Sequence, residues 1–259
     1  MKRIPVWAVA TIAAPVVVAA VVATTLTLAG SRESSPALAV GTDAASTEVV
    51  VGHGRDRTAS RTASDWATYA DHVVVVTAVQ ETEKQPSKKE IERGEGMIGR
   101  TVTERIDKVL WSAPDAPQPP PGILQMSVPG WVFNNNDGHG KRKFAIADSS
   151  RIEVGHTYIR AIEWIDDPCS DDVAKGKWDA LGTGSVIPFD QGVLGMGEFE
   201  GEGRSAETAK AKLKSVDPQV WTLRDKTLGG NANTLVAELK TAKPRKENVM
   251  RRECNPQDQ

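Results

Sequence analysis

The distribution of apolar and polar residues divides the chain into four stretches of different character. Residues 4–29 contain no charged residue, whereas residues 31–64 are small and polar with little periodicity. Short apolar segments alternate with polar loops from 65 to 202, and residues 203–259 carry apolar side chains at helical spacing. We therefore expect an N-terminal transmembrane helix within residues 1–30, then a disordered tether, a β-rich domain and a helical, basic tail.

The apolar segments of the third stretch have the length and composition of β-strands. Four consecutive valines beginning at Val73 are typical of a strand that is buried on both faces. In residues 157–165 the pattern alternates, so that Tyr158 and Trp164 share one face with Arg160. Strands are expected at residues 72–80, 98–111, 123–133, 157–165, 178–188 and 192–199. The predicted fold class is mainly β, either a small closed barrel of the OB type or a sandwich of about six strands.

Two helices are predicted in the C-terminal tail. Residues 205–215 form a helical pattern that Ser205 caps at its N-terminus. In residues 228–242, leucine and alanine recur at helical spacing, with Asn231 as a candidate cap and Pro244 as the stop. Because a helix with one apolar stripe must bury it, we expect these helices to pack on the β-domain.

The uncharged stretch at the N-terminus indicates export. Its 26 residues span about 39 Å as a helix, more than the roughly 30 Å hydrocarbon core of a bilayer. A cleavable signal has an apolar region of only about 7–15 residues, so an uncleaved anchor is favoured. The A-x-A sequence at residues 37–39 keeps open a cleaved, secreted form. Lys2 and Arg3 precede the helix, which predicts that the C-terminal domain lies outside the membrane.

The charge balance limits the class of partner. The formal net charge is −2, which argues against a nucleic-acid-binding protein. The charge is uneven, however, since residues 150–202 are strongly acidic and residues 203–259 are basic. The expected partners are the membrane, through the N-terminal helix, and an extracytoplasmic protein or wall polymer.

The chain contains two cysteines, Cys169 and Cys254, both in the part expected outside the membrane. An even number of cysteines in an oxidising compartment favours a disulfide between them. Two unpaired thiols, one of them in a loose tail, are the alternative.

One acidic loop is a candidate cation site. Asp166, Asp167, Asp171 and Asp172 lie within seven residues, and carboxylates are suitable ligands for a hard cation such as Ca²⁺. The glycine and the glutamate that complete a helix–loop–helix calcium site are missing at their positions. A solvated loop is therefore the favoured interpretation, a cation site is the alternative, and no cofactor is expected.

No sequence motif indicates a particular reaction. The four histidines do not recur at zinc-binding spacing, and the glycine-rich residues 182–185 lack the second glycine of a serine nucleophile elbow. We therefore expect a non-catalytic binding or interaction domain. The alternative is an extracellular hydrolase that uses a carboxylate or serine site.

Three short segments resemble netrin-like modules, which are OB-type barrels. They are A-D-H-V-V-V-V at residues 70–76, I-D-K-V-L-W at 106–111 and G-H-T-Y-I at 155–159. The resemblance covers residues 65–199 and implies a Greek-key barrel of five or six strands with a binding role. Protease-inhibiting members of that family use an N-terminal cysteine, and none precedes this domain, so inhibition is not implied. The succession of anchor, tether and β-domain also resembles uncharacterised exported bacterial proteins.

Overall fold

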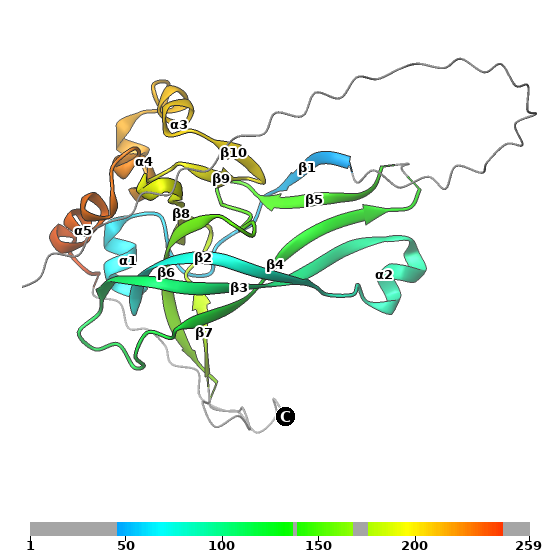
Figure 1. The fold of residues 1–259 in the computed structure, drawn as a ribbon, viewed down its shortest axis with the longest axis horizontal. Coiled ribbons are helices and arrows are strands. Elements are labelled where there is room, and N and C mark those ends of the chain that lie inside the picture. The colour runs from blue at the N-terminus through cyan, green and yellow to red at the C-terminus, as the bar shows by residue number, and fades with distance from the viewer. Residues whose placement is uncertain (1–45, 137–138, 168–175, 246–259) are drawn as a thin grey trace, which may run out of the picture. The chain divides into compact units, whose positions relative to one another are not determined.

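The computed structural model describes residues 46–136, 139–167 and 176–245 (Figure 1). The strands are β1 (Ser46–Gly52), β2 (His72–Glu83), β3 (Glu95–Ser112), β4 (Ile123–Asn134), β5 (Gly140–Ile146), β6 (Thr157–Asp166), β7 (Gly176–Ala180), β8 (Val186–Pro188), β9 (Gly197–Phe199) and β10 (Glu202–Arg204). The α-helices are α1 (Ala63–Tyr69), α2 (Lys88–Arg93), α3 (Ala206–Leu213), α4 (Leu223–Thr227) and α5 (Ala232–Thr241). Three short 3₁₀ turns are η1 (Thr183–Ser185), η2 (Asp190–Gly192) and η3 (Pro218–Val220). The fold is mainly β with C-terminal helices, as the sequence predicts.

Eight strands form one sheet in the order β1-β5-β4-β3-β2-β6-β7, with β8 also paired to β6. The β1–β5 pair is parallel and the other pairs of this sheet are antiparallel. The sheet is not closed into a barrel, so the closed OB-type barrel expected from the pattern and from the netrin-like resemblance is wrong. The edge of β6 is divided between two short strands, with β8 beside residues 158–160 and β7 beside residues 162–166. Among the described residues, no single strand pairs with the whole outer edge of β6.

The valine run of β2 is buried on both faces of the sheet, as predicted. Val73 and Val75 belong to one apolar cluster, and Val74 and Val76 belong to another. The alternation predicted for β6 is also confirmed, because Tyr158 lies in the second cluster and its neighbour Ile159 in the first.

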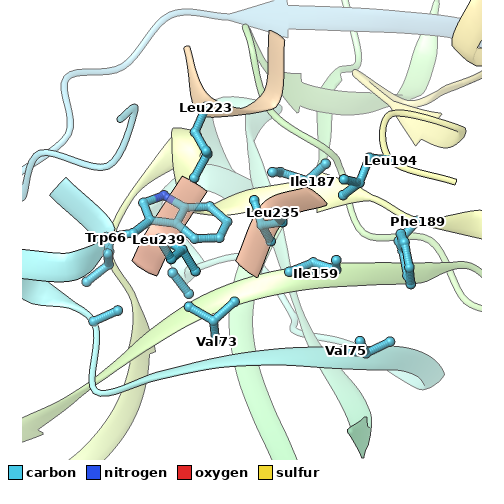
Figure 2. Close-up of a cluster of buried hydrophobic side chains, with 13 residues drawn as sticks. Trp66, Val73, Val75, Ile159, Ile187, Phe189, Leu194, Leu223, Leu235 and Leu239 are labelled. Carbon is cyan, nitrogen blue, oxygen red and sulfur yellow. The ribbon is translucent and has the colours of Figure 1, made fainter. Parts of the chain in front are cut away.

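One face of the sheet, here called the helix face, carries Val73 and Ile159 and is covered by helices (Figure 2). Trp66 of α1 and Leu235 of α5 are fully buried there, and the Trp66 indole Nε1 donates a hydrogen bond to the Ser60 carbonyl at 2.7 Å. The predicted packing on the β-domain is therefore confirmed for α5.

The opposite face, here called the cavity face, has its own apolar cluster and also holds buried charges. Its buried apolar members are Val74, Val76, Ala78, Val102, Leu124, Met126, Ile152, Tyr158, Ile162 and Val186. Arg100 and Glu104 of β3 alternate with Val102 and so point to the same face, where both are completely buried.

The structure corrects the predicted tether and the start of the domain. Residues 46–64 were expected to be disordered, but Ser46–Gly52 forms β1 and pairs with β5. Thr62 caps α1 in a capping box with Asp65, so this helix begins before the predicted domain boundary at 65. The short apolar run at Val49 is stabilised by a partner about 95 residues away, which a local pattern does not reveal.

The ends of several predicted elements also differ from the structure. The expected strand at 178–188 is split into β7, η1 and β8, and of residues 192–199 only the end forms β9. Ser205 caps α3 and Asn231 caps α5, both as predicted. The predicted helix at 228–242 begins only at Ala232, because Gly229 adopts a positive φ of 76° just before it.

Within the described ranges, no helix is both long enough and apolar enough to cross a bilayer. The predicted anchor, residues 1–30, lies outside those ranges.

Candidate ligand-binding site

A cavity of about 290 Å³ lies on the cavity face, between β4 and β5 on one side and β6 and β8 on the other. Its apolar wall consists of Val128, Pro129, Phe144, Ala145, Ile146, Ile152, Ala180 and Val186. Its basic lining consists of Arg55, Arg57, Arg151 and Arg160. An apolar wall with a few placed polar groups is the usual composition of a small-molecule site.

The carboxylate of Asp56 fixes the segment that closes one side of the cavity. Its oxygens accept hydrogen bonds from the Thr183 backbone N–H and hydroxyl, both at 2.9 Å, and from the Ser60 hydroxyl at 3.0 Å. Ser60 in turn accepts from the Gly184 N–H at 3.0 Å. A Cβ at Gly182 would lie 2.6 Å from the Asp56 carboxyl carbon, so this contact requires glycine. Residues 56–60 are thus held against η1.

A buried charge network holds the loop that forms the opposite wall. The Arg100 guanidinium donates to Glu81 at 2.6 Å, to the Ile152 carbonyl at 2.7 Å and to the Arg151 carbonyl. On the other side, the Glu198 carboxylate accepts from the Arg151 N–H at 2.9 Å and the Ile152 N–H at 3.2 Å. Both backbone groups of Ile152 are therefore bonded to charged side chains.

Ile152 adopts a strained backbone conformation at the cavity wall. Its φ is +61°, in the left-handed region that a β-branched residue rarely enters, and its side chain is buried. Such strain costs on the order of 1–3 kcal/mol and persists only where the surroundings impose it. The bonds from Arg100 and to Glu198 supply that constraint. Strain of this kind concentrates at binding and catalytic sites, which makes this wall a candidate functional feature.

Arg160 of β6 is a buried basic group of the cavity. Its side chain is 3% exposed and forms an ion pair with the completely buried Glu104. Among the described residues, the Arg160 Nε and the Glu104 Oε2 have no hydrogen-bond partner. Burial raises the pKa of Glu104, although the Arg160 and Arg100 charges oppose this shift. The pair is thus incompletely satisfied, and only Arg160 lines the cavity.

Arg151 also lines the cavity, but its donors are already bonded. Its guanidinium donates to Glu153 and the Gly130 carbonyl, both at 2.5 Å, and to the Phe144 carbonyl at 3.2 Å. This arginine joins β4, β5 and the loop after β5 into one wall. Its role is structural.

The structure gives no support to the predicted cation site in the part that it describes. Asp166 ends β6, and its Oδ1 accepts a hydrogen bond from the Trp164 indole at 2.9 Å. Asp167 follows it, whereas Asp171 and Asp172 lie outside the described residues. Within the described ranges, no group of three or more His, Cys, Asp or Glu side chains is arranged to hold a metal.

The predicted disulfide also falls on residues that the structure does not describe, since both Cys169 and Cys254 lie outside those ranges. It stays a prediction.

Two groups that sequence inspection considered for catalysis have structural partners. The hydroxyl of Ser185 donates to the Gly182 carbonyl at 2.6 Å and so closes the η1 turn. His156 Nδ1 lies 2.5 Å from Asp190 Oδ2, and the other oxygen of Asp190 accepts from the Thr157 N–H at 2.8 Å. These contacts tie the start of β6 to η2.

Sequence reasoning placed Arg160 on one face with Tyr158 but did not recognise it as a site residue. It also missed Arg100 and Glu104, which alternate with Val102 along one strand. A charged residue among apolar residues of one strand face was the available signal. Arg160 and Glu104 meet only because β3 and β6 both flank β2.

Comparison with known proteins does not assign this chain to a family. A scan against protein-family models found no match, and searches of curated proteins and of solved structures found none either. The netrin-like resemblance thus rests on its three short motifs alone.

Proposed function

We propose that this chain is a non-catalytic binding domain that takes a small ligand in the cavity of its cavity face. The observation that supports it is the buried Arg160, which lines an otherwise largely apolar cavity and has an Nε without a partner among the described residues. A polar group that is left unsatisfied in a buried position is costly, so stability alone does not account for this arginine.

The cavity wall is preformed, because hydrogen bonds hold it in place without a ligand. Charged side chains hold the strained Ile152 on one side, and Asp56 holds residues 56–60 on the other. A preformed site loses little conformational entropy on binding, which favours ligand affinity. A preformed wall of this kind is consistent with a site that binds a ligand without catalysing a reaction.

The test uses the full chain and a filled cavity. Ala180→Phe places an aromatic ring in the cavity from β7, whereas Val79→Phe adds the same ring on an exposed strand position outside the lining. Fluorescence titration with 1-anilinonaphthalene-8-sulfonate and its uncharged relative N-phenyl-1-naphthylamine measures binding. We expect Ala180→Phe, but not Val79→Phe, to abolish the binding of at least one probe. Equal binding by both variants would contradict the proposal.

The proposed place of action is the outer side of the cell membrane, with the domain anchored by residues 1–30. The supporting observation is the uncharged stretch of residues 4–29 behind Lys2 and Arg3. The chain is expected to fractionate with membranes and to resist a carbonate wash. Recovery of a mature form that begins near residue 40 in the medium would show a cleaved signal instead.

A further inference from the structure

We propose that the ligand of the cavity is a small amphiphilic organic anion, with its acidic headgroup on Arg160 and its apolar body on the apolar wall beside it. The inference rests on the proposed function, because it names the chemical class of ligand for the same cavity. It follows from which charges face the cavity, which of them are already bonded, and what surrounds them.

The charges that line the cavity are mostly positive. Four arginines and one carboxylate, that of Asp56, belong to the lining. Asp56 accepts three hydrogen bonds from the neutral donors of Thr183 and Ser60 and keeps its charge. The acidic partners inside the network, Glu104 and Glu198, do not line the cavity. In the lining, the arginines therefore outnumber the carboxylate by four to one.

Three of the four arginines are available to a ligand. Arg151 is not, because its donors are bonded to Glu153 and to two carbonyls. Arg55 and Arg57 are exposed at the rim, and neither makes a hydrogen bond or close ion pair with another described residue. Arg160 is buried, and its Nε has no hydrogen-bond partner among the described residues. This arrangement gives the cavity one buried anion-binding group and two exposed ones at the rim.

The Glu104 carboxylate does not occupy all the hydrogen-bond donors of Arg160. It contacts a single guanidinium nitrogen, Nη1, of Arg160, and its second oxygen has no hydrogen-bond partner among the described residues. A guanidinium offers five N–H donors in a planar fork, and this one retains donors for a carboxylate or sulfonate.

The apolar part of the cavity lining favours a ligand whose apolar portion is small. Val128, Phe144 and Val186 supply aliphatic and aromatic surface beside Arg160. A volume of about 290 Å³ is near the lower end of ligand cavities, which favours a small ligand over a long polymer segment. A small amphiphilic acid matches both the volume and the charge.

The test compares two fluorescent probes of the same skeleton on the full chain. 1-Anilinonaphthalene-8-sulfonate carries the anion, and N-phenyl-1-naphthylamine lacks it. We expect the anionic probe to bind at least about tenfold more tightly, because it adds charge-assisted hydrogen bonds. Octanoate should displace it, and octanamide, of similar length but uncharged, should displace it about tenfold less well.

Variants locate the headgroup. Arg160→Gln combined with Glu104→Gln removes both charges of the buried pair while it keeps similar shapes. This double variant should lose the preference for the anionic probe and retain the binding of the neutral one. Arg105→Gln, at an exposed ion pair with Asp107, is the matched control and should change neither. An unchanged preference in the double variant would overturn the role of Arg160.

The rim offers a second test that does not disturb the core. Arg55→Gln with Arg57→Gln changes two exposed side chains, so folding should be retained even if the buried variant unfolds. We expect anionic binding to weaken about threefold and to depend less on salt, because exposed charges are screened. An unchanged affinity and salt dependence for the anionic probe would overturn the rim contribution to anion binding.

The outcomes separate the two proposals. Equal binding of both probes, lost in Ala180→Phe, would overturn the anionic class of ligand and leave the cavity as a binding site. Probe binding that Ala180→Phe does not affect would overturn the proposed function itself, and the inference with it.

Discussion

The two faces of the central sheet use different chemistry to bury the same strands. On the helix face, α1, α4 and α5 cover an apolar cluster that includes Trp66, Leu223 and Leu235 (Figure 2). On the cavity face, apolar residues share the interior with Arg100, Glu104 and Arg160, all less than 5% exposed. The sheet thus separates a purely apolar cluster from an apolar cluster that also contains buried charges.

The difference between the two faces separates the burial that stabilises the fold from burial that stability alone does not require. Removal of apolar area from water stabilises the helix face without any partner of special geometry. Burial of an ion pair often gains nothing over apolar residues of similar volume, because the desolvation cost is large. The Arg160–Glu104 pair is also incompletely hydrogen-bonded. Its presence on the face that carries the cavity does not follow from stability alone, and the proposed ligand binding would account for it.

The largest effect is expected at Arg100, which joins the cavity face to the strained loop. Arg100→Met removes the bonds to Glu81 and to the Ile152 carbonyl and leaves strain at Ile152 unsupported. We expect a loss of about 3–5 kcal/mol in the free energy of unfolding, as for other broken buried pairs. Urea denaturation measures it. Arg105→Met, at an exposed pair, should cost at most about 1 kcal/mol, and equal costs would refute the distinction.

The helix face should respond through lost packing. Leu235→Ala in α5 leaves a void beside Trp66, so we expect a loss of about 2–5 kcal/mol in the same assay. Val220→Ala, at a side chain that is 68% exposed, is the control and should change stability by about 0.5 kcal/mol or less. A small cost for Leu235→Ala would mean that α5 does not pack on the sheet in solution.

The third prediction sharpens the comparison directly. Replacement of the whole pair, Arg160→Met with Glu104→Leu, should leave stability unchanged or raise it by about 1–4 kcal/mol. Either single replacement should destabilise the fold, since it leaves one buried charge unpaired. Thermal and urea unfolding of all three variants check this. A double variant much less stable than the natural chain would indicate that the pair is there for stability.

The smallest effect concerns Glu163 of β6, which is partly buried. Burial is the main reason that its pKa is raised to about 7, and Asp179 and Asp71 add to this shift while Arg57 opposes it. A raised pKa means that the folded state binds the proton more tightly than the unfolded state does. Its contribution to stability is therefore present below pH 4.5 and is lost as pH rises towards 7. Unfolding of Glu163→Gln across this range should show a flatter pH profile, and an unaltered profile would disprove the assignment.

The local pattern of apolar residues predicted those strands whose burial shows in a few consecutive residues. The valines of β2 and the alternation of β6 needed no knowledge of their partners. β1 and β5 were missed because each is short, and β5 carries Lys141 and Lys143 among its apolar residues. β1 pairs with β5 across about 95 residues, which no local window contains, whereas β5 also pairs with the neighbouring β4.

The candidate site escaped prediction for the same reason. Glu104 and Arg160 are 56 residues apart and belong to strands that do not pair with each other. They meet across β2, where Ala78 lies opposite Glu104 and Val74 lies opposite Arg160. The sequence shows each charge beside apolar neighbours, but the strand order alone brings them together at a cavity.

A crystal structure of the full chain with octanoate tests the central claim most directly. We predict that the carboxylate lies within hydrogen-bond distance of the Arg160 guanidinium and that the alkyl chain contacts Val128 and Val186. Octanoate bound elsewhere, or a cavity that holds only water at saturating octanoate, would contradict the account.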